Sequence, residues 1–218
     1  MILPNFGPES SPVGIRAIAE AAEELGFHSV WTTEHIVVGP EGVNPYGRVY
    51  DSLVTLGWIA GWTERVGLGT SIVLVPLHNP FHLAKQVATL QELSGGRFTL
   101  GVGIGWHRDE YEFMGVEFEG RGRRADEAIR LMRSLWSGRG LFEGRYWSYR
   151  DATAEPHPSR GSDAAHVRSV REQHPELRTI PRVSSVEQVE PMLEAGADGA
   201  IVSFPDEAAM RELARRYR

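Results

Sequence analysis

The sequence predicts an α/β fold built on a parallel sheet. Short apolar runs alternate with longer stretches that have the apolar spacing of amphipathic helices. The run over residues 66–75 is almost continuously apolar, as is typical of a strand covered on both faces. Few hairpin signals separate these units, so we expect right-handed crossovers between parallel strands.

Successive strand–helix units are expected over the first part of the chain. Strands are predicted at 2–6, 29–33, 66–75 and 97–104. Helices are predicted to begin at Ser11-Pro12, after the loop 38–49, at Asn79-Pro80 and at Arg123. Their inward faces are predicted to be Ile15, Ile18, Ala22 and Leu25; Leu53, Leu56, Ile59 and Ala60; Leu83, Val87 and Leu90; and Ala125, Ile129, Met132 and Trp136.

The alternation breaks after residue 140 and then resumes. A small hairpin is expected near 141–150, with its turn around Glu143-Gly144, and 151–163 has the composition of a loop. Further helices are predicted at 164–173, 186–195 and 206–217, and further strands at 177–183 and 199–204. We therefore expect about six strands in a single domain, 1–218, with the hairpin as an insertion in it.

The composition excludes several classes of protein. With 41% hydrophobic and 24% charged residues, the 218-residue chain has the composition of a globular domain. Its net charge of -6 argues against a general nucleic-acid binder, and the absence of Cys excludes disulfides, thiolate zinc sites and a cysteine nucleophile. We see no signal peptide and no apolar run near the ~20 residues of a membrane helix, so a cytoplasmic protein without a membrane partner is expected.

The pair Glu34-His35 is the sharpest candidate for chemistry. Ligands of parallel α/β folds bind at the carboxyl ends of the strands, and this pair follows the second predicted strand. Histidine exchanges a proton near neutral pH, and an adjacent carboxylate can hold its tautomer. We predict His35 as acid or base with Glu34 as its orienting partner; the alternative is a buried structural histidine beside a solvated glutamate.

A glycine-rich run at the end of the fourth predicted strand is a weaker signal. Gly101-Val102-Gly103-Ile104-Gly105 lets a backbone approach a flat ligand closely, or allows close packing of strands. It is not the dinucleotide-binding fingerprint, because Trp106 stands where the third glycine would fall. Trp106 either stacks on an aromatic ligand or belongs to the core.

Other polar residues near strand ends have a structural and a functional interpretation. His78 and His82 have the spacing of two ligands on one helix face, but helix-start polarity is favoured and no metal site is predicted. Asp109-Glu110 favours the start of a short helix. The start of the fourth main helix carries arginines that either hold a phosphate or form a solvated helix start: Arg121, Arg123 and Arg124. We find neither a nucleophile elbow nor a phosphate-binding loop of the nucleotide kinases.

Several segments form a familiar series in their order and spacing. They are LPNFG at 3–7, AAEELGF at 21–27, SVWTTEH at 29–35, VGLGTS at 66–71, HNP at 78–80, LAKQ at 83–86 and LSGGRFTLGVGIGW at 93–106. Together they resemble the bacterial luciferase-like monooxygenase superfamily, especially its branch that uses the deazaflavin coenzyme F-420. The likeness covers roughly residues 2–149, and 177–217 resemble the last two strand–helix units of the family more weakly.

The resemblance implies a TIM-type (β/α) barrel, usually in homodimers, with a flavin or deazaflavin ring at the carboxyl ends of the strands. It places Glu34 and His35 near the reactive centre of the ring. It also implies a non-proline cis peptide at Ser71-Ile72, which forms a bulge behind the ring. The cofactor contacts that it implies are Asn5, Ser71, Ile72, Gly103, Gly105 and Trp106.

The chain departs from the family in one block around residues 156–163. Family members are usually longer there, with two more strands, a helix and a Gly-rich phosphate loop, where this chain has only Pro158 to Asp163. The barrel is therefore expected to be incomplete. Either residues 145–150 and neighbouring segments fill the gap, or a partner subunit covers the open barrel.

The resemblance favours an oxidoreductase that transfers hydride between reduced coenzyme F-420 and a small organic substrate. In this reading the cofactor carries the chemistry, and the protein supplies positioning and electrostatics. The alternatives are an FMN-dependent monooxygenase, or a non-catalytic flavin-binding scaffold that lost the phosphate loop. A fold alone does not decide among them.

Overall fold

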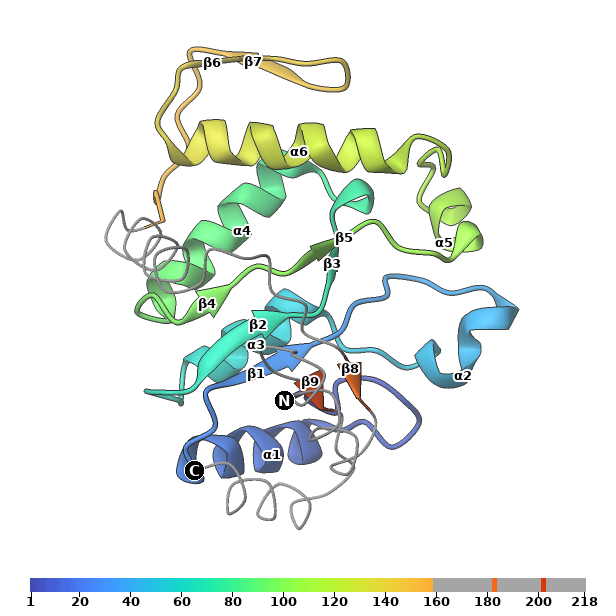
Figure 1. Ribbon diagram of the computed structural model, residues 1–218, viewed down its shortest axis with the longest axis vertical. Helices are drawn as coiled ribbons and strands as arrows, with labels where there is room; N and C mark the ends of the chain where they lie inside the picture. The colour runs from blue at the N-terminus through green and yellow to red at the C-terminus, as the bar shows by residue number, and fades with distance from the viewer. Residues whose placement is uncertain (159–181, 184–200, 203–218) are drawn as a thin grey trace, which may run out of the picture.

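The computed structural model describes residues 1–158, 182–183 and 201–202, and they form an α/β fold of short strands with helices packed outside them (Figure 1). The helices are α1 (Pro12–Glu24), α2 (Val43–Tyr46), α3 (Ser52–Ala60), α4 (Pro80–Leu93), α5 (Arg108–Phe113) and α6 (Arg121–Trp136), with 3₁₀ turns η1 (Pro40–Gly42) and η2 (Val75–Leu77). The strands are β1 (Ser29–Thr32), β2 (Gly67–Thr70), β3 (Val73–Leu74), β4 (Phe98–Thr99), β5 (Val102–Gly103), β6 (Leu141–Glu143), β7 (Ser148–Arg150), β8 (Arg182–Val183) and β9 (Ile201–Val202).

The expected parallel pairing is confirmed in the main sheets. Strands β1, β2 and β4 lie side by side in that order, with Val30 opposite Leu68 and Leu68 opposite Phe98, and β3 pairs with β5. All of these pairs are parallel, so the helices between them are crossovers. The carboxyl ends of the strands therefore meet at one end of the fold.

The strand boundaries differ from the predicted ones at three places. The run 66–75 is divided into β2 and β3 by a kink at Ser71–Ile72, and 97–104 is divided into β4 and β5. The segment 2–6 makes only isolated bridges, from Ile2 to Trp31 and from Phe6 to Val49. Apolar patterning indicates that a segment is extended, but it does not show where the hydrogen-bond ladder is interrupted.

The four main helices predicted before residue 140 are present, and the residues predicted on their inward faces are buried except for Leu25, Ile129 and Trp136, which are half-buried. Ser11 caps α1 by accepting from the Gly14 N–H, and Asn79 caps α4 by accepting from two N–H groups of its first turn. The loop 38–49, expected to be irregular, contains η1 and α2. The fourth main helix, α6, begins at Arg121 rather than Arg123 because Gly120, with a φ of 76°, ends the preceding turn.

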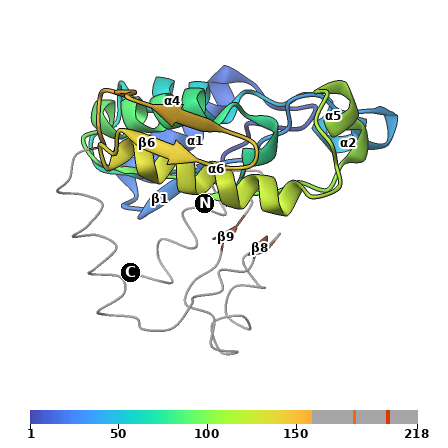
Figure 2. The ribbon, with the colours of Figure 1, turned by 90° about the horizontal axis from the view of Figure 1, so that it is seen from above.

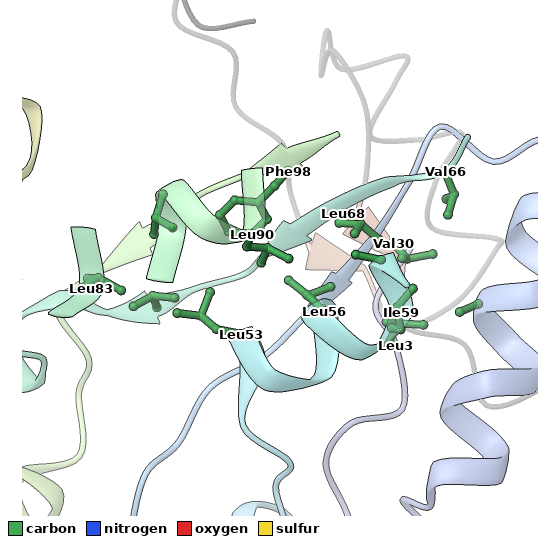
Figure 3. Close-up of a cluster of buried hydrophobic side chains, with 14 of the residues drawn as sticks. Leu3, Val30, Leu53, Leu56, Ile59, Val66, Leu68, Leu83, Leu90 and Phe98 are labelled. Carbon is green, nitrogen blue, oxygen red and sulfur yellow. The ribbon is translucent and has the colours of Figure 1, made fainter. Parts of the chain in front are cut away.

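The core lies between the β1–β2–β4 sheet and the helices that cover it. Figure 3 shows Leu53, Leu56 and Ile59 of α3 meeting Val30, Leu68 and Phe98 of the sheet and Leu83 and Leu90 of α4. Leu56, Ile59, Val30 and Leu83 are completely buried. Burial of this apolar surface is the main stabilising term of the fold.

The predicted hairpin is confirmed as the antiparallel pair β6–β7, but its turn is residues 144–147 rather than Glu143-Gly144, because Glu143 is still in β6 and lies opposite Ser148. The hairpin lies along the outer side of α6 (Figures 1 and 2). The buried carboxylate of Glu127 on α6 accepts from the N–H groups of Arg145, Tyr146 and Trp147, and so holds the hairpin turn.

The predictions for the residues beyond 158 are tested only at two strands. The strand expected at 177–183 contains β8, the one at 199–204 contains β9, and the two are parallel. The helices predicted at 164–173, 186–195 and 206–217, and residues 159–163 of the block 156–163, lie outside the described residues. Within the described part, no helix is long and apolar enough to span a bilayer.

At the amino ends of the strands, the backbone is held by one arginine and one glutamate. All five N–H groups of the Arg97 guanidinium are used: they donate to the carbonyls of Ala60, Thr63, Val66 and Ser94 and to the Thr63 hydroxyl. Glu23 accepts from the backbone N–H groups of residues 64, 65 and 66. Both side chains thus join the turns that lead into β2 and β4.

Candidate active site

His35 lies just beyond the carboxyl end of β1, with its side chain 8% exposed. Its Nδ1 lies 3.0 Å from Oε2 of Glu110, whose side chain is 1% exposed. The other carboxylate oxygen of Glu110 accepts from the N–H groups of Ile36 at 2.5 Å and Val37 at 3.3 Å. Glu110 therefore holds both the imidazole ring and the backbone that follows it.

Glu110 is brought to this position by α5, the short helix that follows β5. Tyr111, fully buried beside Glu110, donates its hydroxyl to the carbonyl of Ile104, and burial raises its pKa to about 12. Figure 1 shows α5 and α2 at the same end of the strands. The residues Asp109-Glu110 do open a short helix as predicted, but the structure gives Glu110 a further contact that the sequence did not reveal.

The expected partnership of Glu34 with His35 is wrong. The Glu34 carboxylate instead accepts from the Leu74 N–H at 2.6 Å and meets Nε2 of His78 at 3.0 Å. Adjacent residues of an extended segment point to opposite sides, so neighbours in the sequence meet different partners. Burial alone would lower the pKa of His78, but the hydrogen bond to Glu34 and the charges of Glu34 and Asp51 outweigh it and raise that pKa.

Aromatic rings surround His35. The ring of Tyr46 lies 4.3 Å from the imidazole, and the ring of Trp106 lies 6.0 Å from it in an edge-on arrangement. Phe6 contacts Tyr46 at 5.6 Å, and Trp106 stacks on His107 at 5.0 Å. Sequence reasoning assigned Tyr46 only to a loop, because nothing in its local pattern shows that α2 folds back over the end of β1.

The non-proline cis peptide expected at Ser71–Ile72 is present. It lies beside β1: Ser71 donates its N–H to the Thr32 carbonyl at 2.7 Å, and its own carbonyl accepts from the Thr33 hydroxyl at 2.9 Å. Ser71 and Ile72 are both half-buried. The kink therefore forms part of the wall at the carboxyl ends of the strands.

Close packing accounts for the glycines of the β4–β5 segment. A Cβ at Gly101 would overlap the Thr70 carbonyl, and one at Gly103 would come within 2.6 Å of the Ile72 side chain. Gly105 has a φ of +68°, and a Cβ there would come within 2.8 Å of Leu74. Of the two interpretations of this run, the packing of neighbouring strands is the one that these contacts support.

Asn5 is fully buried and its amide is satisfied by the main chain. It donates to the carbonyls of Thr33 at 2.8 Å and Tyr50 at 3.0 Å, and it accepts from the Thr33 N–H. Asn5 thus joins the first segment to the end of β1. It exposes no atom for the cofactor contact predicted for it, so we interpret it as a positioning residue.

The arginines at the start of α6 are neither free phosphate ligands nor a purely solvated helix start. Arg121 donates to the carbonyls of Gly105 and Phe118, and Arg124 donates to the carbonyl of Pro76 while its guanidinium lies 4.5 Å from the Trp147 ring. Both side chains are half-buried, whereas Arg123 is exposed. Arg121 and Arg124 therefore tie α6 to the carboxyl ends of β3 and β5.

Exposed apolar side chains follow β5 toward the candidate site. Val102 and Ile104 are each 40% exposed and Trp106 is 59% exposed, at alternate positions that lead out of β5. The Trp106 ring contacts His35 at 6.0 Å, and an exposed aromatic ring beside a buried histidine–carboxylate pair is typical of a ligand site. Among the described residues there is no group of three or more His, Cys, Asp or Glu side chains that could hold a metal ion.

Parallel strands with a histidine–carboxylate pair and aromatic rings at their carboxyl ends are typical of α/β proteins that bind small molecules there. The family model for luciferase-like monooxygenases matches residues 4–218, and the chain belongs to this family. Barrel closure, the homodimer and the cytoplasmic location stay predictions.

Relatives in this family use different cofactors. The chain is 39% identical, over 69% of its length and 45% of the relative, to an F-420-dependent glucose-6-phosphate dehydrogenase of Kineococcus radiotolerans. It is 31% identical, over 65% of its length and 38% of the relative, to the oxygenase component of a flavin-dependent trigonelline monooxygenase of Acinetobacter baylyi. The chain thus spans less than half the length of these two relatives.

A solved structure extends the likeness over nearly the whole chain. A monooxygenase from Streptomyces bottropensis is 28% identical and superposes with a TM-score of 0.63, over 91% of this chain and 56% of that one. The described part of this chain therefore has the α/β fold of the luciferase-like family.

Proposed function

We propose that the chain is an oxidoreductase that transfers hydride between reduced coenzyme F-420 and a small organic substrate. The observation that carries the proposal is the His35 ring, held through Nδ1 on buried Glu110 beside the exposed edge of Trp106. The likeness to an F-420-dependent dehydrogenase supports the deazaflavin. A histidine that can exchange a proton next to a ring-binding edge is the arrangement this reaction needs.

In this proposal the bound deazaflavin supplies the hydride, and the protein handles the accompanying proton. Nε2 of His35 has no hydrogen-bond partner among the described residues, so it is the ring nitrogen left to meet the substrate. It donates a proton to the heteroatom of a substrate that is reduced, and accepts one in the reverse direction. Tyr46 and Trp106 lie beside the imidazole, whose side chain is 8% exposed, and low exposure to water strengthens the polar interactions of the ring.

The residues that would hold the ring are those of the exposed edge and the kink. We propose that Ser71 and Ile72 lie behind the ring and that Gly103, Gly105 and Trp106 line its edge. Glu34 does not touch His35, and we propose that it acts on the site indirectly, through the Leu74 backbone and His78.

A second candidate is an FMN-dependent monooxygenase acting on a small organic substrate. The observation that favours it is the likeness to a flavin-dependent monooxygenase at 31% identity. A flavin ring would use the same apolar edge, and His35 would again exchange protons at the substrate. The two candidates therefore differ in the cofactor and share the residues.

Tryptophan fluorescence during titration with coenzyme F-420, and separately with FMN, tests the proposal. Binding of a ring beside Trp106 is expected to quench emission saturably, and Trp106→Phe, the matched control, should lose most of that quenching. Saturation by F-420 alone supports the first candidate, and saturation by FMN alone supports the second. Binding of neither cofactor would contradict both candidates and favour a non-catalytic scaffold.

A further inference from the structure

Two histidine–carboxylate pairs lie at the carboxyl ends of the strands, and the neighbours Glu34 and His35 belong to different pairs. His35 pairs with Glu110, which is 75 residues away, while Glu34 pairs with His78. We propose that Glu110 is the positioning residue of His35: it fixes the tautomer with hydrogen on Nδ1 and leaves Nε2 to meet the substrate. The catalytic meaning of this assignment rests on the proposed function, but the tautomer is a property of the chain itself.

The direction of the His35–Glu110 hydrogen bond follows from the other contacts of the carboxylate. Oε1 of Glu110 faces the N–H groups of Ile36 and Val37, which can only donate. Oε2 faces Nδ1 of His35. An ionised carboxylate only accepts hydrogen bonds, so the ring donates through Nδ1–H, and its second nitrogen, Nε2, is the one that gains or loses a proton.

Glu34 does not orient His35, because its carboxylate has other partners. Its Oε2 accepts from the Leu74 N–H and meets His78, the residue just before the α4 cap Asn79. This second pair joins the end of β1 to β3 and to the start of α4. A substitution of Glu34 is therefore expected to change the environment of His78 and to leave the tautomer of His35 as it is.

Glu110 also fixes the aromatic wall beside His35. The Ile36 and Val37 N–H groups that it binds begin the loop that carries Tyr46 over the imidazole. The loop also packs closely on α5: a Cβ at Gly39 would overlap the Asp109 carboxylate, and one at Gly42 would lie 2.5 Å from His107. One buried carboxylate thus sets both the tautomer of the histidine and the position of the ring that covers it.

The substitution Glu110→Gln gives a sharp test, because the glutamine amide has a fixed orientation here. The Ile36 and Val37 N–H groups require the oxygen of the amide, so its NH₂ group must face Nδ1 of His35. Nδ1 then has to accept, and the hydrogen moves to Nε2. Nitrogen-15 NMR of the imidazoles, with His35 assigned by its loss in His35→Gln, reports which nitrogen carries hydrogen.

The wild-type chain at pH above neutrality is expected to show Nδ1–H at His35, and Glu110→Gln is expected to show Nε2–H. Glu34→Gln should leave the His35 signal unchanged and shift that of His78. The matched control is Glu112→Gln, an exposed position on the same helix, which should shift neither. Nε2–H in the wild type, or a reversed tautomer in Glu34→Gln but not in Glu110→Gln, would overturn the proposal.

A kinetic measurement connects the tautomer to the proposed function. If the chain turns over a substrate with F-420 or FMN, Glu110→Gln is expected to lower kcat by about 10²–10⁴-fold and to change KM little, because the wrong tautomer cannot exchange the proton. An unchanged kcat alongside a reversed tautomer would remove Glu110 from the mechanism. Failure to bind either cofactor would refute the proposed function, while the NMR result would still decide the pairing of the histidines.

Discussion

The two ends of the strands use ionic side chains in different ways. At the amino ends, Arg97 and Glu23 bind backbone groups and a hydroxyl. At the carboxyl ends, the carboxylates of Glu110 and Glu34 each bind backbone N–H and also contact a histidine. An ionic side chain whose partners are all fixed stabilises the fold, whereas a carboxylate that is bound to an imidazole also influences which ring nitrogen carries hydrogen.

Exposed apolar side chains also lie close to the candidate site. Val102, Ile104 and Trp106 are 40%, 40% and 59% exposed where β5 leads to the candidate site. At the other end, β2 and β4 are preceded by turns that Arg97 and Glu23 hold. An exposed aromatic side chain beside a buried histidine–carboxylate pair is typical of a ligand site.

The largest expected effect is a loss of activity on substitution at the carboxyl ends of the strands but not at their amino ends. His35→Ala removes the group that exchanges the proton, so kcat of the proposed reaction is expected to fall by about 10²–10⁴-fold. The matched control is His28→Ala, an exposed histidine just before the amino end of the same strand, β1. Steady-state kinetics with the cofactor that binds measure both variants. Wild-type activity in His35→Ala would remove His35 from the mechanism.

The next largest effect is a loss of stability on substitution of Arg97, at the amino ends of the strands. Arg97→Met leaves the four carbonyls and the hydroxyl that it binds without their partner, and the free energy of unfolding is expected to fall by about 3 kcal/mol. Urea unfolding measures this loss. Arg133→Met, at an exposed position of α6, should cost little. The His35 tautomer should be the same in both variants, and a change in Arg97→Met would show that the two ends are coupled.

The His78–Glu34 pair predicts a loss of stability on the alkaline side. Because the pKa of His78 is raised above 6.5, the pair stabilises the fold fully below that value and progressively less as pH rises through the higher folded-state pKa. The difference in unfolding free energy between wild type and His78→Gln is therefore expected to be larger at about pH 5.5 than at about pH 8.5. His82→Gln, at an exposed position of α4, is the control. A difference that grew with pH would contradict the pairing.

The smallest effect is expected at Glu23, where stability is lost as pH falls rather than as it rises. Burial would raise its pKa, but three backbone N–H groups and the charge of Arg65 lower it below 4.5. Its contribution is present above that value and is lost as pH falls through the lower folded-state pKa. Wild type and Glu23→Gln should differ by under about 1 kcal/mol at neutral pH, since the group is partly exposed, and converge in acid. Unfolding curves that diverged in acid would contradict this assignment.

Local patterning predicted the four main helices before residue 140 well, because their signals lie within a few residues. The spacing of Leu53, Leu56 and Ile59 identified the buried face of α3, and Asn79 identified the start of α4. The interruptions of the strands were not predictable in this way. Whether an extended residue joins a ladder depends on a neighbouring strand that is distant in sequence, as Gly101 against Thr70 illustrates.

By itself the sequence determined the parallel α/β class, the place of His35 at a strand end and, through its family likeness, the cis peptide at Ser71–Ile72. Only the tertiary structure decided which carboxylate serves which histidine and that Tyr46 covers His35. The physical reason is the geometry of extended chain and crossovers. Adjacent side chains diverge along a strand, while crossovers bring α5 and the 38–49 loop, far apart in sequence, to the same strand ends.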